Sequence, residues 1–210
     1  MNNDFLFSAV ADVLSGAGTS GQLGDMAAGM GITRALVVTD PGIIKFGLLD
    51  SAVANLEANN IALHIYSDVV ADPPEAVVMD AVRVAQEFGC DGVIGFGGGS
   101  SMDVAKLLAV LIKGEQALAD IYGVDQISGG RLPLIQVPTT AGTGSEATMV
   151  SIITTGETTK AGVVSLTLLA DKIILDAGLT TGLPPAVTAA TGIDAMVHAI
   201  EAFTTKRLKN

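Results

Sequence analysis

The sequence is poor in cysteine and in positive charge, and each shortage excludes a class of protein. Cys90 is the only cysteine, so no internal disulfide can form, which favours a cytoplasmic protein. Its apolar neighbours predict a small buried residue rather than a nucleophile. Only 11 Lys and Arg residues stand against 22 Asp and Glu, a net charge of −11, and no basic cluster occurs. Since nucleic-acid affinity comes chiefly from neutralising phosphates, we exclude a nucleic-acid partner.

Long hydrophobic runs are also missing. The most apolar internal stretch, residues 107–112, lies between Lys106 and Lys113 and is far shorter than the roughly 20 residues of a membrane helix. The apolar start, residues 1–13, has no preceding Lys or Arg and contains Asp4, unlike a secretory signal. The pattern therefore predicts a soluble protein without membrane attachment.

The chain is nevertheless 49% hydrophobic, and its apolar runs alternate with segments of helical period. Three strand and helix pairs are expected, followed by two further strands: 35–38 with 43–59, 61–66 with 74–88, 92–95 with 101–112, then 134–137 and 173–175. The strand runs are continuously apolar, as in a sheet buried on both faces. We predict an α/β fold, a Rossmann-like parallel sheet with helices on both faces, which would bind its ligand beyond the carboxyl ends of the strands.

The amino-acid composition changes near Gly182, which is followed by Leu183 and two prolines. Residues 186–203 are Ala-rich and helix-prone, with an interruption expected at Gly192. We place a boundary here, between an α/β domain at residues 1–182 and the beginning of an all-helical second domain at residues 183–210. The polar end, residues 204–210, has no helix stop signal, so we expect the chain to be part of a longer protein. Four apolar side chains of this helical segment would then lack partners and promote association: Val187, Ile193, Val197 and Ile200.

A glycine-rich turn follows the strand at residues 92–95 and opens the next helix. Gly97, Gly98 and Gly99 allow backbone N–H groups to approach a ligand closely, and the helix N-terminus adds partial positive charge, so the turn could hold a diphosphate. Ser100 could donate to a phosphate oxygen or cap the helix. The spacing matches neither the dinucleotide fingerprint nor the P-loop, and an ordinary glycine turn is the alternative.

Asp40 stands at the end of the strand at residues 35–38, before Pro41 and Gly42. A carboxylate there can accept hydrogen bonds from both hydroxyls of an adenosine ribose and would repel a 2′-phosphate, which favours NAD over NADP. Asp before Pro-Gly is also ordinary turn chemistry.

The loop at residues 139–146 combines hydroxyls with small residues, as a backbone that wraps a ligand would, although a structural turn is the alternative. Lys160, in a later polar segment, could reach a phosphate, but the sequence by itself favours a surface residue without a binding role.

Asp194 and His198 are four residues apart on an expected helix, a spacing that lets both ligate one divalent cation. A helical Asp–His hydrogen bond is the alternative, and a catalytic metal needs at least three ligands. His64 is predicted to be structural.

Three segments, residues 97–106, 138–146 and 192–203, in this order and spacing, resemble the iron-containing (group III, metal-dependent) alcohol dehydrogenase family over nearly the whole chain. The resemblance implies an N-terminal Rossmann-like domain that binds NAD(P) and an all-helical domain that holds Fe²⁺, sometimes Zn²⁺, in the cleft between them. It further implies a small alcohol or aldehyde substrate and a homodimer or higher homo-oligomer, joined through N-terminal strands.

Position by position, the resemblance implies that the glycine turn (Gly97, Gly98, Gly99 and Ser100) holds the diphosphate, with Asp103 nearby, and that Asp40 holds the ribose. Other implied cofactor contacts are Thr139, Thr140, Thr143, Thr148, Lys160 and Leu179. Asp194 and His198 match the first two metal ligands; the other two are histidines beyond this chain. Where the family often has Asn-Pro beside the cofactor, this sequence has Asp72-Pro73, and that contact is not carried over because a carboxylate would repel a diphosphate unless it points away.

The sequence thus predicts the N-terminal part of an NAD-dependent, metal-dependent alcohol dehydrogenase or aldehyde reductase, inactive alone. Two alternatives stay open: a non-catalytic nucleotide-binding module, and a lyase of the dehydroquinate synthase type, which the Asp194/His198 spacing and the Thr-rich loop disfavour.

Overall fold

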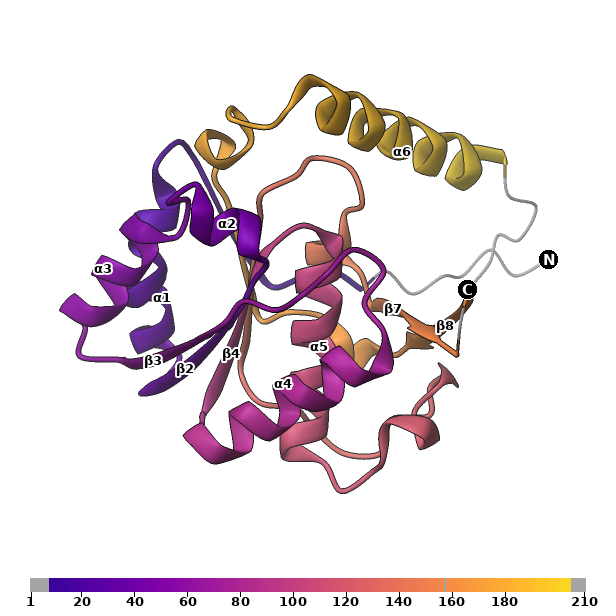
Figure 1. Ribbon diagram of the computed structural model, residues 1–210, viewed down its shortest axis with the longest axis horizontal. Helices are drawn as coiled ribbons and strands as arrows, with labels where there is room; N and C mark the ends of the chain where they lie inside the picture. Colours follow the sequence, from indigo (N-terminus) through magenta and orange to yellow (C-terminus); the bar gives the residue numbers. More distant parts are fainter. Residues whose placement is uncertain (1–7, 157, 205–210) are drawn as a thin grey trace.

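A computed structural model describes residues 8–156 and 158–204. The first seven residues of the apolar start and the polar C-terminal residues 205–210, which two sequence predictions concern, lie outside the described residues. The centre of the molecule is a six-stranded sheet in the order β1-β9-β6-β4-β2-β3, with every neighbouring pair parallel (Figure 1). Its strands are β1 (Asp12–Ser15), β2 (Arg34–Val38), β3 (Ala62–Tyr66), β4 (Gly92–Gly97), β6 (Leu134–Pro138) and β9 (Lys172–Leu175).

Helices cover both faces of this sheet. Alternate residues of a strand point to opposite sides, and in the central strands both sets are apolar, so each face needs a layer of helices to bury it. Leu36 and Val38 of β2 pack in one core with α4 (Glu75–Phe88) and α5 (Gly99–Lys113). Ala35 and Val37 pack in a second core with α1 (Leu23–Gly29) and α3 (Asp50–Ala58). The predicted Rossmann-like α/β fold is confirmed. Cys90 is buried, as predicted, and burial raises the pKa of its thiol.

Two helical predictions were wrong in detail. The helix expected over residues 43–59 is divided into α2 (Pro41–Lys45) and α3, because Gly47 between them takes a left-handed φ of 65°. The interruption expected at Gly192 does not occur, and α6 (Pro185–Thr204) runs through it. A glycine inside a helix costs only about 1 kcal/mol relative to alanine, which the helix-prone neighbours offset. None of the helices among the described residues combines the length and hydropathy that a membrane crossing requires.

A small second sheet was not predicted. Strands β7 (Val150–Thr155) and β8 (Thr159–Val164) form an antiparallel hairpin, and β5 (Gly123–Val124) pairs with β8. The hairpin packs against α5, and the polar segment that contains Lys160 is strand β8. Short 3-10 helices complete the fold: η1 (Thr19–Gln22), η2 (Leu118–Asp120), η3 (Ser145–Ala147), η4 (Leu166–Leu168) and η5 (Ala177–Thr180).

The strand order reverses direction at β2, since the chain passes from β2 to β3 on one side and later to β4 on the other. In open α/β sheets, such a switch point opens a crevice beyond the carboxyl ends of the two strands. Asp40 follows β2 at this end, and the glycine turn follows β4. Helix α6 also lies beyond this end of the sheet (Figure 1).

Candidate functional site

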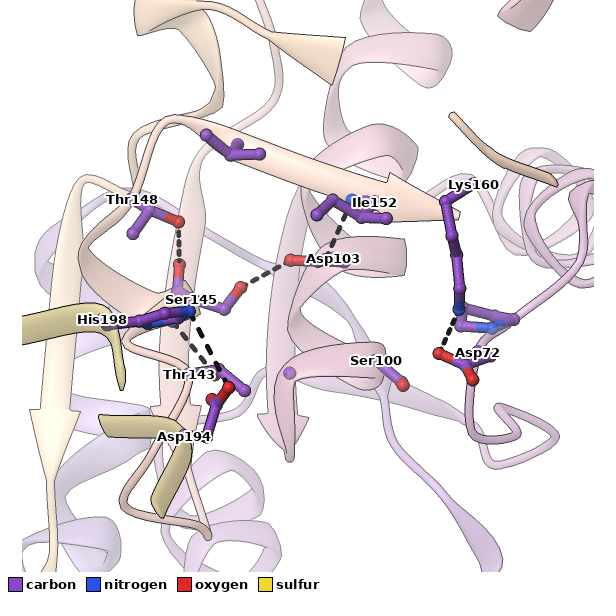
Figure 2. A pocket seen from close by; sticks show the side chains of 13 residues that line it. Asp72, Ser100, Asp103, Thr143, Ser145, Thr148, Ile152, Lys160, Asp194 and His198 are labelled. Atoms are coloured by element: carbon purple, nitrogen blue, oxygen red, sulfur yellow. Dashed lines mark hydrogen bonds and ion pairs between the residues drawn. The ribbon is translucent and has the colours of Figure 1, made fainter. Parts of the chain in front are cut away.

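Two adjoining cavities occupy the carboxyl end of the sheet. The larger, of about 660 Å³, is bounded by α5, the hairpin β7-β8 and α6 (Figure 2). The smaller, of about 440 Å³, lies between the residues after β2 and the start of α5. Gly99 and Ser100 line both cavities, so the start of α5 is common to them.

The start of α5 is built as the glycine turn predicts. Gly98 is the N-cap residue and no side chain caps the helix, so Ser100 is not the cap that the sequence left as an alternative. The first N–H groups of α5 therefore have no partner within the helix and remain available as donors. A Cβ on Gly99 would lie 3.0 Å from Cγ2 of Thr143, which shows how closely the Thr-rich loop approaches this turn. A helix N-terminus with open donors beside a cavity has the donor set and the partial charge that suit a diphosphate.

Asp40 acts as the N-cap of α2. Its Oδ1 accepts hydrogen bonds from the N–H groups of Gly42 (2.8 Å) and Ile43 (3.2 Å), as the turn alternative expected. Asp40 also lines the smaller cavity together with Gly98 and Gly99. The cap employs one carboxylate oxygen, and within the described part of the chain no hydrogen bond is formed by the other.

The four threonines predicted to line a cofactor cleft have different positions. Thr143 and Thr148 line the larger cavity. Thr140 lies 3.8 Å from the position of a Cβ on Gly98, so it faces the glycine turn. Thr139 is buried, and its backbone N–H donates to the carbonyl of Gly97 (2.9 Å), which holds the loop against β4.

A buried lysine that sequence reasoning missed ties this loop to α5. Lys106 is fully buried, and its ammonium donates to Ser145 Oγ (2.8 Å), Thr148 Oγ1 (3.2 Å) and the carbonyl of Val150 (2.7 Å). It also lies 3.5 Å from the carboxylate of Asp103. Desolvation lowers the pKa of Lys106, although the negative charge of Asp103 opposes the shift. The signal in the sequence was a lysine within the apolar face of a helix, three residues after an aspartate.

Asp103 lines the larger cavity but is already engaged. Its Oδ1 accepts from Ser145 Oγ (2.5 Å), and its Oδ2 accepts from the N–H of Ile152 (2.9 Å) on β7 (Figure 2). Asp103 and Lys106 together join α5, the Thr-rich loop and the hairpin, so they hold the walls of the cavity in place.

Lys160 lines the larger cavity from β8, and its ammonium forms an ion pair with the carboxylate of Asp72 (Figure 2). Both side chains are partly exposed, at 46% and 77%. The carboxylate of Asp72 therefore faces the cavity beside a cation rather than pointing away from it.

Asp194 and His198 reach the larger cavity from α6. Their Oδ1 and Nε2 atoms are 3.8 Å apart, one turn from each other on the same face, with half-exposed side chains. No cluster of three or more His, Cys, Asp or Glu that could hold a metal occurs in residues 8–156 and 158–204. The pair has the donor chemistry of two ligands of a divalent cation and no more than two.

Leu179 and His64 also lie away from these cavities. Leu179 of η5 is buried in the core that α1 and α3 form with the sheet, and it lines neither cavity. His64, predicted to be structural, lies on the edge strand β3 with its ring 5.6 Å from that of Phe88.

Comparison with known proteins shows the family of this chain. The family model described as iron-containing alcohol dehydrogenase matches residues 11–177. The chain belongs to this family. The curated relatives of this alcohol dehydrogenase family member include long-chain-alcohol dehydrogenase 1 of Geobacillus thermodenitrificans, 45% identical over 83% of this chain and 45% of the relative. Sulfoacetaldehyde reductase of Bilophila wadsworthia is 38% identical over 95% of this chain and 52% of the relative.

Solved structures of the family have the same fold. A 1,3-propanediol oxidoreductase matches 97% of this chain and 53% of its own with a TM-score of 0.93 and 32% identity. Sulfoacetaldehyde reductase from Bifidobacterium kashiwanohense, solved in complex with NAD⁺, matches 96% of this chain and 54% of its own with a TM-score of 0.85 and 31% identity. The chain spans about half the length of the relatives that it matches.

Proposed function

We propose that this chain forms the nucleotide-binding part of an NAD-dependent, metal-dependent alcohol dehydrogenase or aldehyde reductase. The reaction is hydride transfer between a nicotinamide and a small alcohol or carbonyl compound. The observation that carries the proposal is the convergence on two adjoining cavities of an uncapped helix N-terminus, a carboxylate after β2 and an Asp/His pair on α6.

The cofactor would lie across both cavities. The N–H groups at the start of α5 would bind the diphosphate, and the free oxygen of Asp40 would accept from the adenosine ribose hydroxyls and repel a 2′-phosphate. The Thr-rich loop, with Thr139, Thr140, Thr143 and Thr148, would cover the cofactor. Lys160 would contact its oxygens. Leu179 would pack near the ribose-nicotinamide end of the cofactor, from the core that it shares with α1 and α3.

Asp194 and His198 would supply two ligands to Fe²⁺ or Zn²⁺, and the metal, when bound, polarises the substrate oxygen. The aspartate contributes negative charge, and the imidazole, when neutral, contributes a nitrogen ligand. We place the remaining ligands in a helical domain from residue 183 onward, in the part of the relatives that this chain does not match. The chain alone should therefore bind metal weakly and turn over little or no substrate.

A non-catalytic nucleotide-binding module is the second candidate. It is favoured by the lack, among the described residues, of a third metal ligand near Asp194 and His198. A protein that comprises only these residues would bind NADH and reduce no aldehyde, whereas the dehydrogenase would regain activity when a metal-binding domain is supplied.

We also infer that the complete enzyme is cytoplasmic and forms a homodimer or larger homo-oligomer. Light scattering would measure its oligomeric state.

Calorimetric titration of NADH and NADPH into the 210-residue polypeptide, with and without Fe²⁺ or Zn²⁺, tests the nucleotide site. We expect metal-independent binding of NADH and weaker binding of NADPH. Asp40→Ser keeps an oxygen that can cap α2 but removes the charge, so it should narrow the difference between the two cofactors. A folded polypeptide, by circular dichroism, that binds neither cofactor would overturn the proposal.

A further inference from the structure

Lys160, which we propose to contact the cofactor's oxygens, already forms an ion pair with Asp72. Among the residues that line the larger cavity, Lys160 is the one lysine or arginine, while the acidic lining residues are Asp72, Asp103 and Asp194. Asp103 is already paired with Lys106. An anion that enters the cavity near Gly99 and Ser100 therefore has one lysine among the lining residues to pair with, Lys160, and this lysine already forms an ion pair with Asp72.

The backbone keeps Asp72 within reach of Lys160. The carbonyl of Asp72 accepts from Thr154 Oγ1 (3.0 Å), and the carbonyl of Pro73 accepts from the N–H of Thr154 (2.9 Å) on β7. Lys160 on β8 is paired in register with Thr154. The loop before α4 is thus attached to the hairpin at the residue that lies opposite Lys160, and the contact between the two charges follows from this attachment.

We propose that Asp72 sets the affinity of this site for a dinucleotide diphosphate by competing with it for Lys160. This inference rests on the proposed function. An ion pair between two partly exposed side chains is weak, so an anionic ligand can replace the carboxylate at little cost. The carboxylate still lowers affinity in two ways: the pair must open before Lys160 can bind the diphosphate, and the released carboxylate then stands near the ligand's negative charge.

The substitution Asp72→Asn tests the proposal with little risk to the fold. Asp72 has a left-handed φ of 52°, a conformation that asparagine also tolerates, and the backbone hydrogen bonds to Thr154 do not involve the side chain. We expect Asp72→Asn to bind NADH roughly two- to tenfold more tightly than the unchanged chain at low salt, with a smaller gain at high salt. Asp68→Asn is the matched control, because Asp68 is an exposed acid of the same loop that lines neither cavity, and NADH affinity should stay unchanged.

Titrations followed by NADH fluorescence should be repeated in a Lys160→Met background. If Asp72 acts by holding Lys160, the gain from Asp72→Asn should be smaller there, because no ammonium is left to release. An equal gain in both backgrounds would mean simple charge repulsion and would overturn the competition. Unchanged or weaker NADH binding by Asp72→Asn overturns the inference while leaving the proposed function intact. Failure of every folded variant to bind NADH overturns both.

Discussion

Helices α5 and α6 contribute side chains to the same cavity, but the rest of the molecule holds them very differently. Helix α5 is buried along most of its length between the sheet, α4 and the hairpin, and even one of its two lysines, Lys106, is fully buried. None of the described side chains of α6 is buried. The half of the site that α5 provides is therefore part of the core, while the Asp194/His198 half lies on a helix with few contacts.

The apolar side chains of α6 sharpen this contrast. Val187, Ile193, Val197 and Ile200 are exposed, as the sequence predicted, and so are Met196 and Phe203. One close approach joins α6 to the Thr-rich loop, where a Cβ on Gly142 would lie 2.7 Å from the carbonyl oxygen of Thr191. Changes within α5 should thus affect folding and cofactor binding together, whereas changes within α6 should leave both nearly intact.

The largest effect is expected for Lys106→Met. Removing the ammonium leaves Asp103, Ser145 and Thr148 without their shared donor in a buried setting, so the free energy of unfolding should fall by about 3 kcal/mol. Urea denaturation would measure it. Lys113→Met, at the exposed end of the same helix, should change stability by less than about 0.5 kcal/mol. Equal effects of the two substitutions would contradict the structural role of Lys106.

Gly99→Val should weaken NADH binding at least about tenfold, because the added side chain meets Thr143 and fills the space beside the helix N-terminus. Calorimetry would measure the affinity, and circular dichroism would confirm that the protein folds. Gly192→Ala, inside α6, serves as the control and should leave NADH affinity unchanged. An unaffected Gly99→Val variant would remove the start of α5 from the cofactor site.

Exposed apolar groups on α6 should drive self-association of the polypeptide. Replacing Ile193, Val197 and Ile200 together by glutamine should shift light scattering toward the monomer without a measurable loss of stability, since none of the three is buried. The same scattering profile before and after substitution would show that association, if present, uses another surface.

The pH dependence of stability should carry the signature of Lys106. Its pKa is lowered in the folded state by desolvation, so between that value and the unfolded value of about 10.4 the unfolded chain binds more protons, and stability rises with pH. The difference in unfolding free energy between the unchanged chain and Lys106→Met should therefore grow as pH rises from neutral toward 10. A difference that shrinks over this range would contradict the lowered pKa.

The smallest effect is expected for Gly142→Ala. The new methyl group meets backbone atoms of Thr191, so α6 must shift, while the contacts of α5 are unaffected. Hydrogen exchange should become faster in residues 185–204 and stay the same in residues 99–113. Faster exchange in both helices would mean that α6 is coupled to the core after all.

Local chemistry determined much of this molecule. Continuous apolar runs specified the buried parallel strands, the glycine turn specified that a helix begins after β4, and the four-residue spacing specified the shared face of Asp194 and His198. Periodicity is a property of neighbouring residues, so these features needed no knowledge of distant ones.

Tertiary structure alone decided the rest, because it depends on contacts between residues far apart in the chain. Nothing near Lys106 in the sequence indicates that Ser145, Thr148 and Val150 surround its ammonium. The hairpin that carries Lys160 was not predicted from its own sequence, and in the structure it packs against α5. The hydrogen bond between Thr154 and Pro73 then brings Asp72 to Lys160. Burial and charge pairing depend on which surfaces pack together, and those contacts form only when the whole chain folds.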